Sequence, residues 1–173
     1  MEDPFELLGA PRKYDLDLAA VEKTHRDLSR ELHPDKFASA GASERKAALD
    51  KAASVNEAWR IVRDPIRRAE ALFALAGIAV AETNETSTIS VPPKFLMEMM
   101  EAREALAEAR AKKDLEKVRS LGEGIRARYE VTQAKLAEGL QTAPRSAVSR
   151  LGEMRFYKRF LDEVDAIEDE AAG

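Results

Sequence analysis

Residues 17–36 read DLAAVEKTHRDLSRELHPDK, and this stretch predicts an amphipathic helix that stops at His33-Pro34-Asp35. Its apolar residues recur at helical spacing on one face, and they are Leu18, Val21, Leu28 and Leu32. Asp17 is a typical N-cap, so we expect the helix to run from about Leu18 to Leu32. Pro34 disfavours helical geometry at His33 and removes a backbone donor. The chain is therefore predicted to leave the helix there and to continue as a loop through Phe37 and Gly41.

Further helices are predicted on both sides of this one in the first half of the chain. A short segment from Pro4 to Leu8 stops at Gly9. After the loop, Ser43 can cap a long helix. The apolar stripe of that helix comprises Ala48, Ala52, Val55, Trp59 and Val62. Asp64-Pro65 is typical of an N-cap followed by proline in the first turn, so a last helix should run from Ile66 to Ala76 and close on Gly77.

A second group of helices is predicted after a break. The polar, aperiodic run from Thr83 to Thr88, followed by two prolines, marks a linker. Beyond it, helical patterns cover about 94–111, 115–140 and 143–170, and the caps of the last two helices would be Asp114 and Thr142. Gly122 and Gly124 interrupt the apolar face of the middle helix. Short connections imply antiparallel neighbours, so we predict an all-α protein with one domain at 1–76, a linker at 77–93 and a three-helix bundle at 94–173.

Composition narrows the functional classes. The 173 residues are 45% hydrophobic and 35% charged, which is typical of a soluble folded protein. Lys and Arg number 28 against 32 Asp and Glu, so no global basic field is available for nucleic acid or an anionic membrane. Cysteine is absent, which excludes disulfides and thiolate ligation of zinc or an iron–sulfur cluster by this chain. The N-terminus is acidic and no apolar run approaches the ~20 residues of a membrane span, so a cytoplasmic protein is expected.

The charged residues are distributed unevenly around the predicted helix at 18–32. Lys23, Arg26 and Arg30 gather opposite the apolar stripe, and we call these three residues the basic face. Taken alone, the basic face is most simply a solvated helix surface. His25 lies on the apolar side and is predicted to be a packing residue with one ring nitrogen satisfied, because no partner ligand for a metal is evident. Trp59 is expected to lie in the core.

The basic face, the following His33-Pro34-Asp35-Lys36, Ala58-Trp59 and Asp64-Pro65 together resemble the J-domain of the DnaJ co-chaperones, over about residues 1–76. The resemblance implies an antiparallel helical hairpin with short flanking helices, which docks on a DnaK-type chaperone ATPase. It makes Lys23, Arg26 and Arg30 the docking face, and it makes His33, Pro34 and Asp35 the loop that controls hydrolysis.

The chemistry of the tripeptide suits a role in binding. Pro34 restricts the backbone, so its neighbours are ordered at less cost when a partner binds. Asp35 can accept charge-assisted hydrogen bonds from a partner's arginine, and His33 can donate or accept. No second acid, base or metal ligand accompanies these residues, so the sequence assigns no catalytic residue, metal or cofactor. The alternative is a simple turn with an Asp cap.

The second half lacks the Gly/Phe-rich stretch and the cysteine-rich zinc module that follow the J-domain in typical DnaJ proteins. Instead, FLMEMMEARE at 95–104 with Leu106 resembles the client-binding helix of the HscB family, the J-proteins of iron–sulfur cluster assembly. The likeness extends across the whole chain and includes HPDKFAS at 33–39 and NEAW at 56–59. Some eukaryotic members carry a cysteine-rich extension, and this cysteine-free chain resembles the bacterial type.

By this resemblance the bundle holds an IscU-type scaffold, and the J-domain presents it to the specialised chaperone HscA. Leu96, Met97 and Met100 would form an apolar patch, Phe156 would join it from the last helix, and Glu101 and Glu104 would supply a polar rim. The residues give weaker support of their own, because Met97, Met99 and Met100 make the helix apolar over a wider arc than one bundle seam needs. Alternatively, these methionines simply fill the bundle.

The sequence thus predicts a co-chaperone adaptor that is not itself an enzyme, with a chaperone ATPase and a scaffold protein as partners and with no nucleic acid or membrane. A general DnaJ-like protein that serves DnaK with other clients remains the alternative, and an inert helical adaptor is a third possibility. Glycine-rich phosphate loops, ligand clusters and nucleophile–base pairs are absent from the sequence, which argues against an enzyme. The angle between the domains, the oligomeric state, and the choice between HscA and DnaK stay open.

Overall fold

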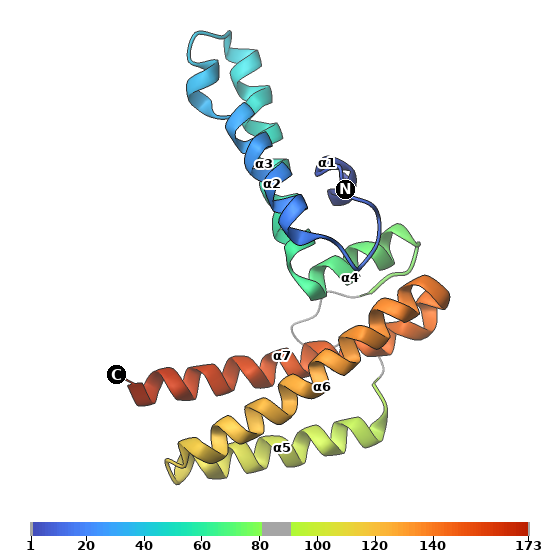
Figure 1. Cartoon of the computed structure of the whole chain (residues 1–173), viewed down its shortest axis with the longest axis vertical. Helices are drawn as coiled ribbons and strands as arrows, with labels where there is room; N and C mark the ends of the chain where they lie inside the picture. Colours follow the sequence, from blue (N-terminus) through green and yellow to red (C-terminus); the bar gives the residue numbers. More distant parts are fainter. Residues whose placement is uncertain (1, 81–90, 173) are drawn as a thin grey trace. The chain divides into compact units, whose positions relative to one another are not determined.

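The computed structural model describes residues 2–80 and 91–172, and the regular elements in these two ranges are all helical. The chain divides into two compact units, residues 1–78 and 79–173, which are described separately below (Figure 1). The all-α fold class is therefore confirmed. The predicted linker at 77–93 falls mainly on residues 81–90, which lie outside the described residues. The predicted domain bounds stay predictions.

The first unit is built on a helical hairpin of α2 (Leu18–Glu31) and α3 (Ala42–Arg63). The short helix α1 (Pro4–Leu7) packs against α3, and α4 (Pro65–Leu75) follows α3 and contacts it (Figure 1). The core between these helices comprises Phe5, Leu8, Val21, Val55, Ala58 and Val62. Burial of this apolar set is the main force that holds the hairpin together.

Side-chain caps fix most helix starts in this unit. A carboxylate oxygen of Asp17 accepts from the N–H of Ala20 at 3.1 Å, and Asp64 accepts from two N–H groups of α4, so both predicted caps are confirmed. The predicted cap at Ser43 is wrong, because α3 begins at Ala42 after Gly41 and has no side-chain cap. Ser43 already lies inside the helix, so its hydroxyl does not cap the helix start. Gly77 closes α4 with φ of 70°, the left-handed geometry that glycine tolerates.

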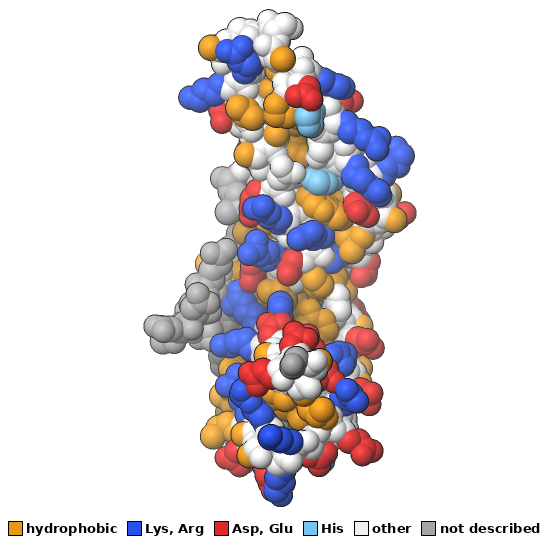
Figure 2. All heavy atoms as spheres, turned by 90° about the vertical axis from the view of Figure 1, so that its left-hand side faces the viewer, with side chains coloured by type: hydrophobic (Ala, Val, Ile, Leu, Met, Phe, Trp, Pro, Cys, Tyr) orange, Lys and Arg blue, Asp and Glu red, His pale blue; other side chains and the backbone are white. Residues whose placement is uncertain are grey.

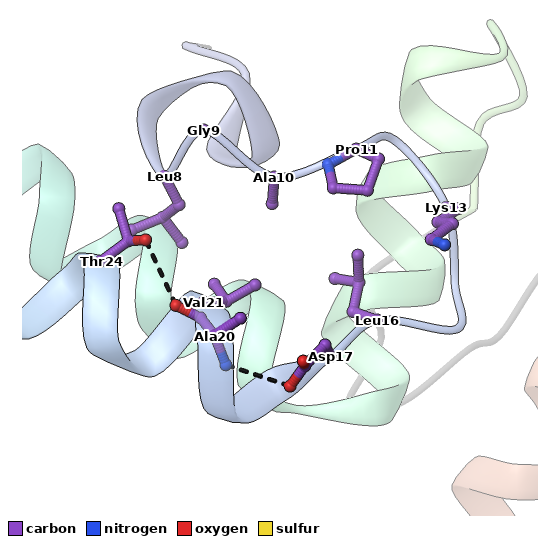
Figure 3. A pocket seen from close by; sticks show the side chains of 10 residues that line it. All are labelled: Leu8, Gly9, Ala10, Pro11, Lys13, Leu16, Asp17, Ala20, Val21 and Thr24. Atoms are coloured by element: carbon purple, nitrogen blue, oxygen red, sulfur yellow. Dashed lines mark hydrogen bonds between the residues drawn. The ribbon is translucent and has the colours of Figure 1, made fainter.

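A hollow of about 200 Å³ lies between α2 and the segment that follows α1. Figure 3 shows the side chains that line it, and they are Leu8, Gly9, Ala10, Pro11, Lys13, Leu16, Asp17, Ala20, Val21 and Thr24. Asp17 caps α2 there, and the Thr24 hydroxyl donates to the Ala20 carbonyl oxygen at 3.2 Å. The polar groups of these two residues are thus engaged within α2, and the rest of the lining is mainly apolar.

The second unit is a three-helix bundle of α5 (Pro93–Ala111), α6 (Leu115–Thr142) and α7 (Pro144–Ala172), as predicted (Figure 1). All three helices contact one another. The buried core of the bundle comprises Val91, Phe95, Met99, Leu106, Ala109, Val118, Ile125, Tyr157, Phe160, Val164 and Ile167. Asp114 caps α6 by accepting from the Lys117 N–H at 3.0 Å, which confirms the predicted cap.

The contact between α6 and α7 depends on small residues. A methyl group added at Gly122 would lie 3.0 Å from Cγ1 of Val164, and one added at Gly139 would lie 2.7 Å from Cβ of Ala147. Gly122 therefore allows the two helices to approach closely, and α6 continues through it without a break. The predicted cap at Thr142 is wrong, because Thr142 is the last residue of α6 and its hydroxyl donates to the Glu138 carbonyl oxygen.

Candidate partner-binding surfaces

The tripeptide His33-Pro34-Asp35 begins a short 3-10 helix, Pro34–Phe37, where the sequence predicted a loop. Pro34 occupies the first position of this helix, for which its fixed backbone angle is suited. His33 is extended, with φ of −62° and ψ of 134°, as expected before a proline. The Asp35 N–H donates to Nδ1 of His33 at 3.3 Å, so the histidine caps the helix that follows it. The tripeptide is thus an ordered corner and not an irregular loop.

The side chains of this corner point to solvent. Those of His33 and Asp35 are 59% and 91% exposed. Nδ1 of His33 lies 3.5 Å from Oδ2 of Asp35, which is an ion pair only when the imidazole is protonated. Because Nδ1 accepts a backbone N–H, the neutral imidazole carries its proton on Nε2. With His33 neutral, the Asp35 carboxylate has no cationic partner among residues 2–80 and 91–172.

The basic face lies along the exposed side of α2. Lys23 donates to Asp27 at 2.9 Å, Arg30 lies 3.7 Å from the same carboxylate, and Arg26 lies 3.6 Å from Glu22. The hydrogen bond from Lys23 is the main reason why the pKa of Asp27 lies below its usual value. Exposed pairs of this kind contribute at most about 1 kcal/mol, so an acidic partner can compete for these cations. Figure 2 shows lysine and arginine side chains gathered beside the two histidines on this view.

His25 and Trp59 join α2 to α3 beneath this surface. Their rings stack with centroids 5.5 Å apart and an interplanar angle of 18°. Nε2 of His25 lies 2.9 Å from Oδ1 of Asn56, so the prediction of a packing histidine with a satisfied ring nitrogen is confirmed. Trp59 is only partly buried against the core, where the sequence predicted a core residue. Sequence reasoning missed the role of Asn56, whose position one turn before Trp59 was the available signal.

The second candidate surface is the outward side of α5. Leu96, Met97 and Met100 are 38%, 63% and 64% exposed, and we call these three residues the α5 patch. Met99 is 3% exposed and belongs to the bundle core. The alternative that methionines merely fill the bundle is therefore correct for Met99 and wrong for Met97 and Met100. Large exposed apolar side chains that gather in this way are typical of a binding surface.

The residues predicted around the α5 patch lie at different depths. Glu101 and Glu104 are exposed on the same helix. Phe156 of α7 is half-buried, and its ring meets that of Phe95 edge to face with centroids 5.7 Å apart. Phe95 also contacts Tyr157 at 5.3 Å. Phe156 thus reaches α5 through Phe95, the residue that immediately precedes Leu96 in the chain.

Burial shapes the polar chemistry next to Phe95. Burial of the Tyr157 hydroxyl away from water disfavours its charged form, and this is the main reason why its pKa lies above the usual value. The negative charge of Glu153 raises this pKa further. Glu153 is itself buried, and both of its carboxylate oxygens accept from Arg150, at 2.8 and 3.0 Å. The interior next to Phe95 therefore combines close packing with one buried, paired carboxylate. In the described ranges 2–80 and 91–172, no three His, Cys, Asp or Glu side chains are grouped to hold a metal ion.

In the part of the chain that the structure describes, none of the helices is both long enough and apolar enough to cross a membrane.

Known proteins resemble both halves of the chain. A family model described as the HSCB C-terminal oligomerisation domain matches residues 91–165, which fall within the second unit. A Bordetella avium protein described as a co-chaperone protein HscB homolog is 36% identical over 169 residues, covering 96% of this chain and 98% of that protein. A Cupriavidus taiwanensis protein of the same description is 37% identical over 173 residues and covers 97% of each chain.

Solved structures match the arrangement of helices. The chaperone HscB from Vibrio cholerae superposes with a TM-score of 0.86 at 31% identity, covering 97% of this chain and 98% of that one. Human co-chaperone protein HscB has a TM-score of 0.87 at 23% identity, covering 97% of this chain and 83% of that one, and so supports the fold. These matches confirm an N-terminal J-domain followed by a C-terminal helical domain. Because the bacterial relatives share more than a third of their residues with this protein over nearly its whole length, the chain belongs to the HscB family of co-chaperone proteins.

Proposed function

We propose that this protein stimulates the ATPase of an HscA-type chaperone and delivers to it an IscU-type scaffold protein of iron–sulfur cluster assembly. The observation that carries the proposal is the presence in one chain of two unlike exposed surfaces. One is the polar corner at His33-Pro34-Asp35 beside the basic face, and the other is the apolar α5 patch. An adaptor between two proteins needs such a pair of surfaces.

The corner and the basic face suit an ATPase partner with an acidic docking surface. Long-range attraction to Lys23, Arg26 and Arg30 would speed association and set the orientation. Asp35 would then accept a charge-assisted hydrogen bond from a basic group of the chaperone, and its carboxylate is free to do so when His33 is neutral. Because the 3-10 helix already holds the corner, little ordering is required on binding.

The α5 patch suits a protein client. Two exposed methionines beside a leucine form an apolar surface that adapts to its partner, because methionine is flexible and polarisable. Glu101 and Glu104 supply a polar rim on the same helix. The cluster itself would be cargo of the scaffold, since this chain contains no cysteine to ligate it.

A chaperone ATPase assay tests the proposal. We expect the protein alone to stimulate hydrolysis by a purified HscA-type chaperone, and we expect protein and scaffold together to stimulate it by more than the sum of their separate effects. The reason is that an adaptor raises the effective concentration of the scaffold at the chaperone. The same assay with DnaK is the comparison. Purely additive stimulation of HscA, or equal synergy with DnaK, would contradict the proposal.

A further inference from the structure

Met97 and Met100 are the two most exposed large apolar side chains in the described part of the chain, at 63% and 64% of their surface. They stand three residues apart on α5, so they lie next to each other on one face of the helix. Met99 and Met154, by contrast, are only 3% and 0% exposed. The exposed pair and the buried pair therefore offer their thioether sulfur atoms to solutes in water to very different degrees.

The sequence confines sulfur to one of the two exposed surfaces. Methionine is the only sulfur-containing residue of the chain, because cysteine is absent. Residues 2–80 contain no methionine, so the corner at His33-Pro34-Asp35 and the basic face have no sulfur atom. The remaining methionine, Met1, lies outside the described residues. A reagent that attacks thioethers would thus change the α5 patch and leave the corner and the basic face as they are.

Oxidation of a thioether changes the character of the side chain. A peroxide transfers one oxygen atom to the sulfur, its oxygen–oxygen bond breaks, and its other oxygen leaves as water with both protons. The sulfur loses two electrons and the peroxide gains them. The product is a sulfoxide, which is polar where the thioether was apolar. Methionine sulfoxide reductases reverse the change with two electrons from thiols, and the oxygen then leaves as water.

We propose that Met97 and Met100 form a redox modification site, where oxidation by a peroxide switches off scaffold binding and leaves activation of the chaperone intact. The inference rests on the proposed function, since it assigns a regulation to the α5 patch. Exposure makes both thioethers accessible to the oxidant, and their place in the α5 patch puts each sulfoxide at the contact with the client. The oxidised protein would still dock on the chaperone but would bring no scaffold to it.

The loss of affinity follows from burial of the new polar group. A thioether enters an apolar contact at little desolvation cost, but a sulfoxide oxygen must give up its hydrogen bonds to water. An unsatisfied buried acceptor costs enough free energy to weaken binding about tenfold for each sulfoxide. The bundle itself should not change, because the buried side chains of Met99 and Met154 are sheltered from the oxidant.

Limited treatment of the full-length protein with hydrogen peroxide, which is removed before the scaffold is added, tests this inference. Peptide mass spectrometry should find the added oxygen at Met97 and Met100 before Met99 and Met154. Calorimetric titration with purified, untreated IscU-type scaffold should give a Kd at least about tenfold above that of the reduced protein. Reductases for both sulfoxide epimers should restore the original Kd. Stimulation of an HscA-type chaperone without scaffold should be unchanged, and the synergy with scaffold should be lost.

Two variants identify the sulfur atoms that are responsible. The double variant Met97→Leu and Met100→Leu cannot form the two sulfoxides, so its Kd should be the same before and after peroxide. Each sample is compared with itself, so the starting affinity of this variant does not enter the comparison. The matched control is Met154→Leu, a substitution of similar volume at a buried position, and it should lose affinity on oxidation as the wild type does.

Each outcome has a defined meaning. Oxidised wild type that binds the scaffold with the Kd of the reduced protein would overturn the inference. So would equal oxidation rates at exposed and buried methionines, an equal loss of affinity in the double leucine variant, or no recovery after reduction. Loss of chaperone stimulation in the absence of scaffold would contradict the selectivity for the α5 patch. If the reduced wild type does not bind the scaffold, the proposed function fails. If it binds and oxidation has no effect, only the modification site fails.

Discussion

Asp35→Asn is expected to abolish stimulation of the chaperone ATPase and to leave the fold and scaffold binding unchanged. The substitution keeps the size and shape of the side chain but removes its charge, and charge-assisted hydrogen bonds are about twice as strong as neutral ones. The Asp35 carboxylate is 91% exposed and supports no helix, because the contact that orders the corner uses the backbone N–H of Asp35. We expect at least a tenfold loss of stimulation, which corresponds to about 1.4 kcal/mol in the transition state of hydrolysis.

The matched control for this variant is Asp50→Asn. Asp50 is an exposed acid on α3 of the same unit, so its replacement changes the net charge of the protein equally. Circular dichroism should show the same helicity for both variants, and scaffold titration should give the wild-type Kd for both. Wild-type ATPase stimulation by Asp35→Asn would refute the role assigned to the corner. Loss of stimulation in Asp50→Asn would show that net charge, and not this carboxylate, is what matters.

The triple variant Leu96→Ala, Met97→Ala and Met100→Ala is expected to weaken scaffold binding at least a hundredfold. Interface residues near the centre of a contact cost about 1 kcal/mol or more each when truncated, so three together lose about 3 kcal/mol or more. Their side chains are exposed, and Met99 and Phe95 keep α5 in the bundle, so the fold should be retained. Calorimetric titration with the scaffold measures the loss. Stimulation of the chaperone in the absence of scaffold should be that of the wild type.

Leu49→Ala is the control for removal of exposed apolar surface. Leu49 is 55% exposed on α3 and lies in the J-domain, so scaffold affinity should not change. Phe156 is better tested separately, because its ring packs against Phe95 and its truncation would disturb the bundle as well as the surface. A triple variant that binds the scaffold with wild-type affinity would place the client elsewhere on the protein.

Local rules predicted most of the fold. The three aspartates that cap α2, α4 and α6 were identified from sequence because an N-cap depends on only a few neighbouring residues. Ser43 and Thr142 fit the same rule, but these two predictions are wrong. The helix α3 begins one residue before Ser43, and the Thr142 hydroxyl donates back within α6. The 3-10 helix at Pro34–Phe37 was missed because its hydrogen bonds are few and leave no periodic pattern.

The candidate sites were predictable to different degrees. The outward direction of Lys23, Arg26 and Arg30 follows from helical spacing alone. Apolar residues cover a wide arc of the first turns of α5, so spacing could not distinguish buried Met99 from exposed Met97 and Met100. That distinction depends on which side of α5 meets α6 and α7, and only tertiary packing decides it.

The contact of Phe156 with Phe95 likewise joins residues of different helices, and no local sequence pattern specifies it.

The central claim is that one chain couples the chaperone to the scaffold, and a mixing experiment tests it directly. Asp35→Asn retains the α5 patch, and the triple alanine variant retains the corner at His33-Pro34-Asp35. Equal amounts of the two are added to chaperone and scaffold, and ATP hydrolysis is compared with that given by the wild type. We predict that the mixture stimulates no more than the triple variant and scaffold do without Asp35→Asn, since the scaffold is held by molecules that cannot activate the chaperone. Wild-type synergy from the mixture would contradict the claim.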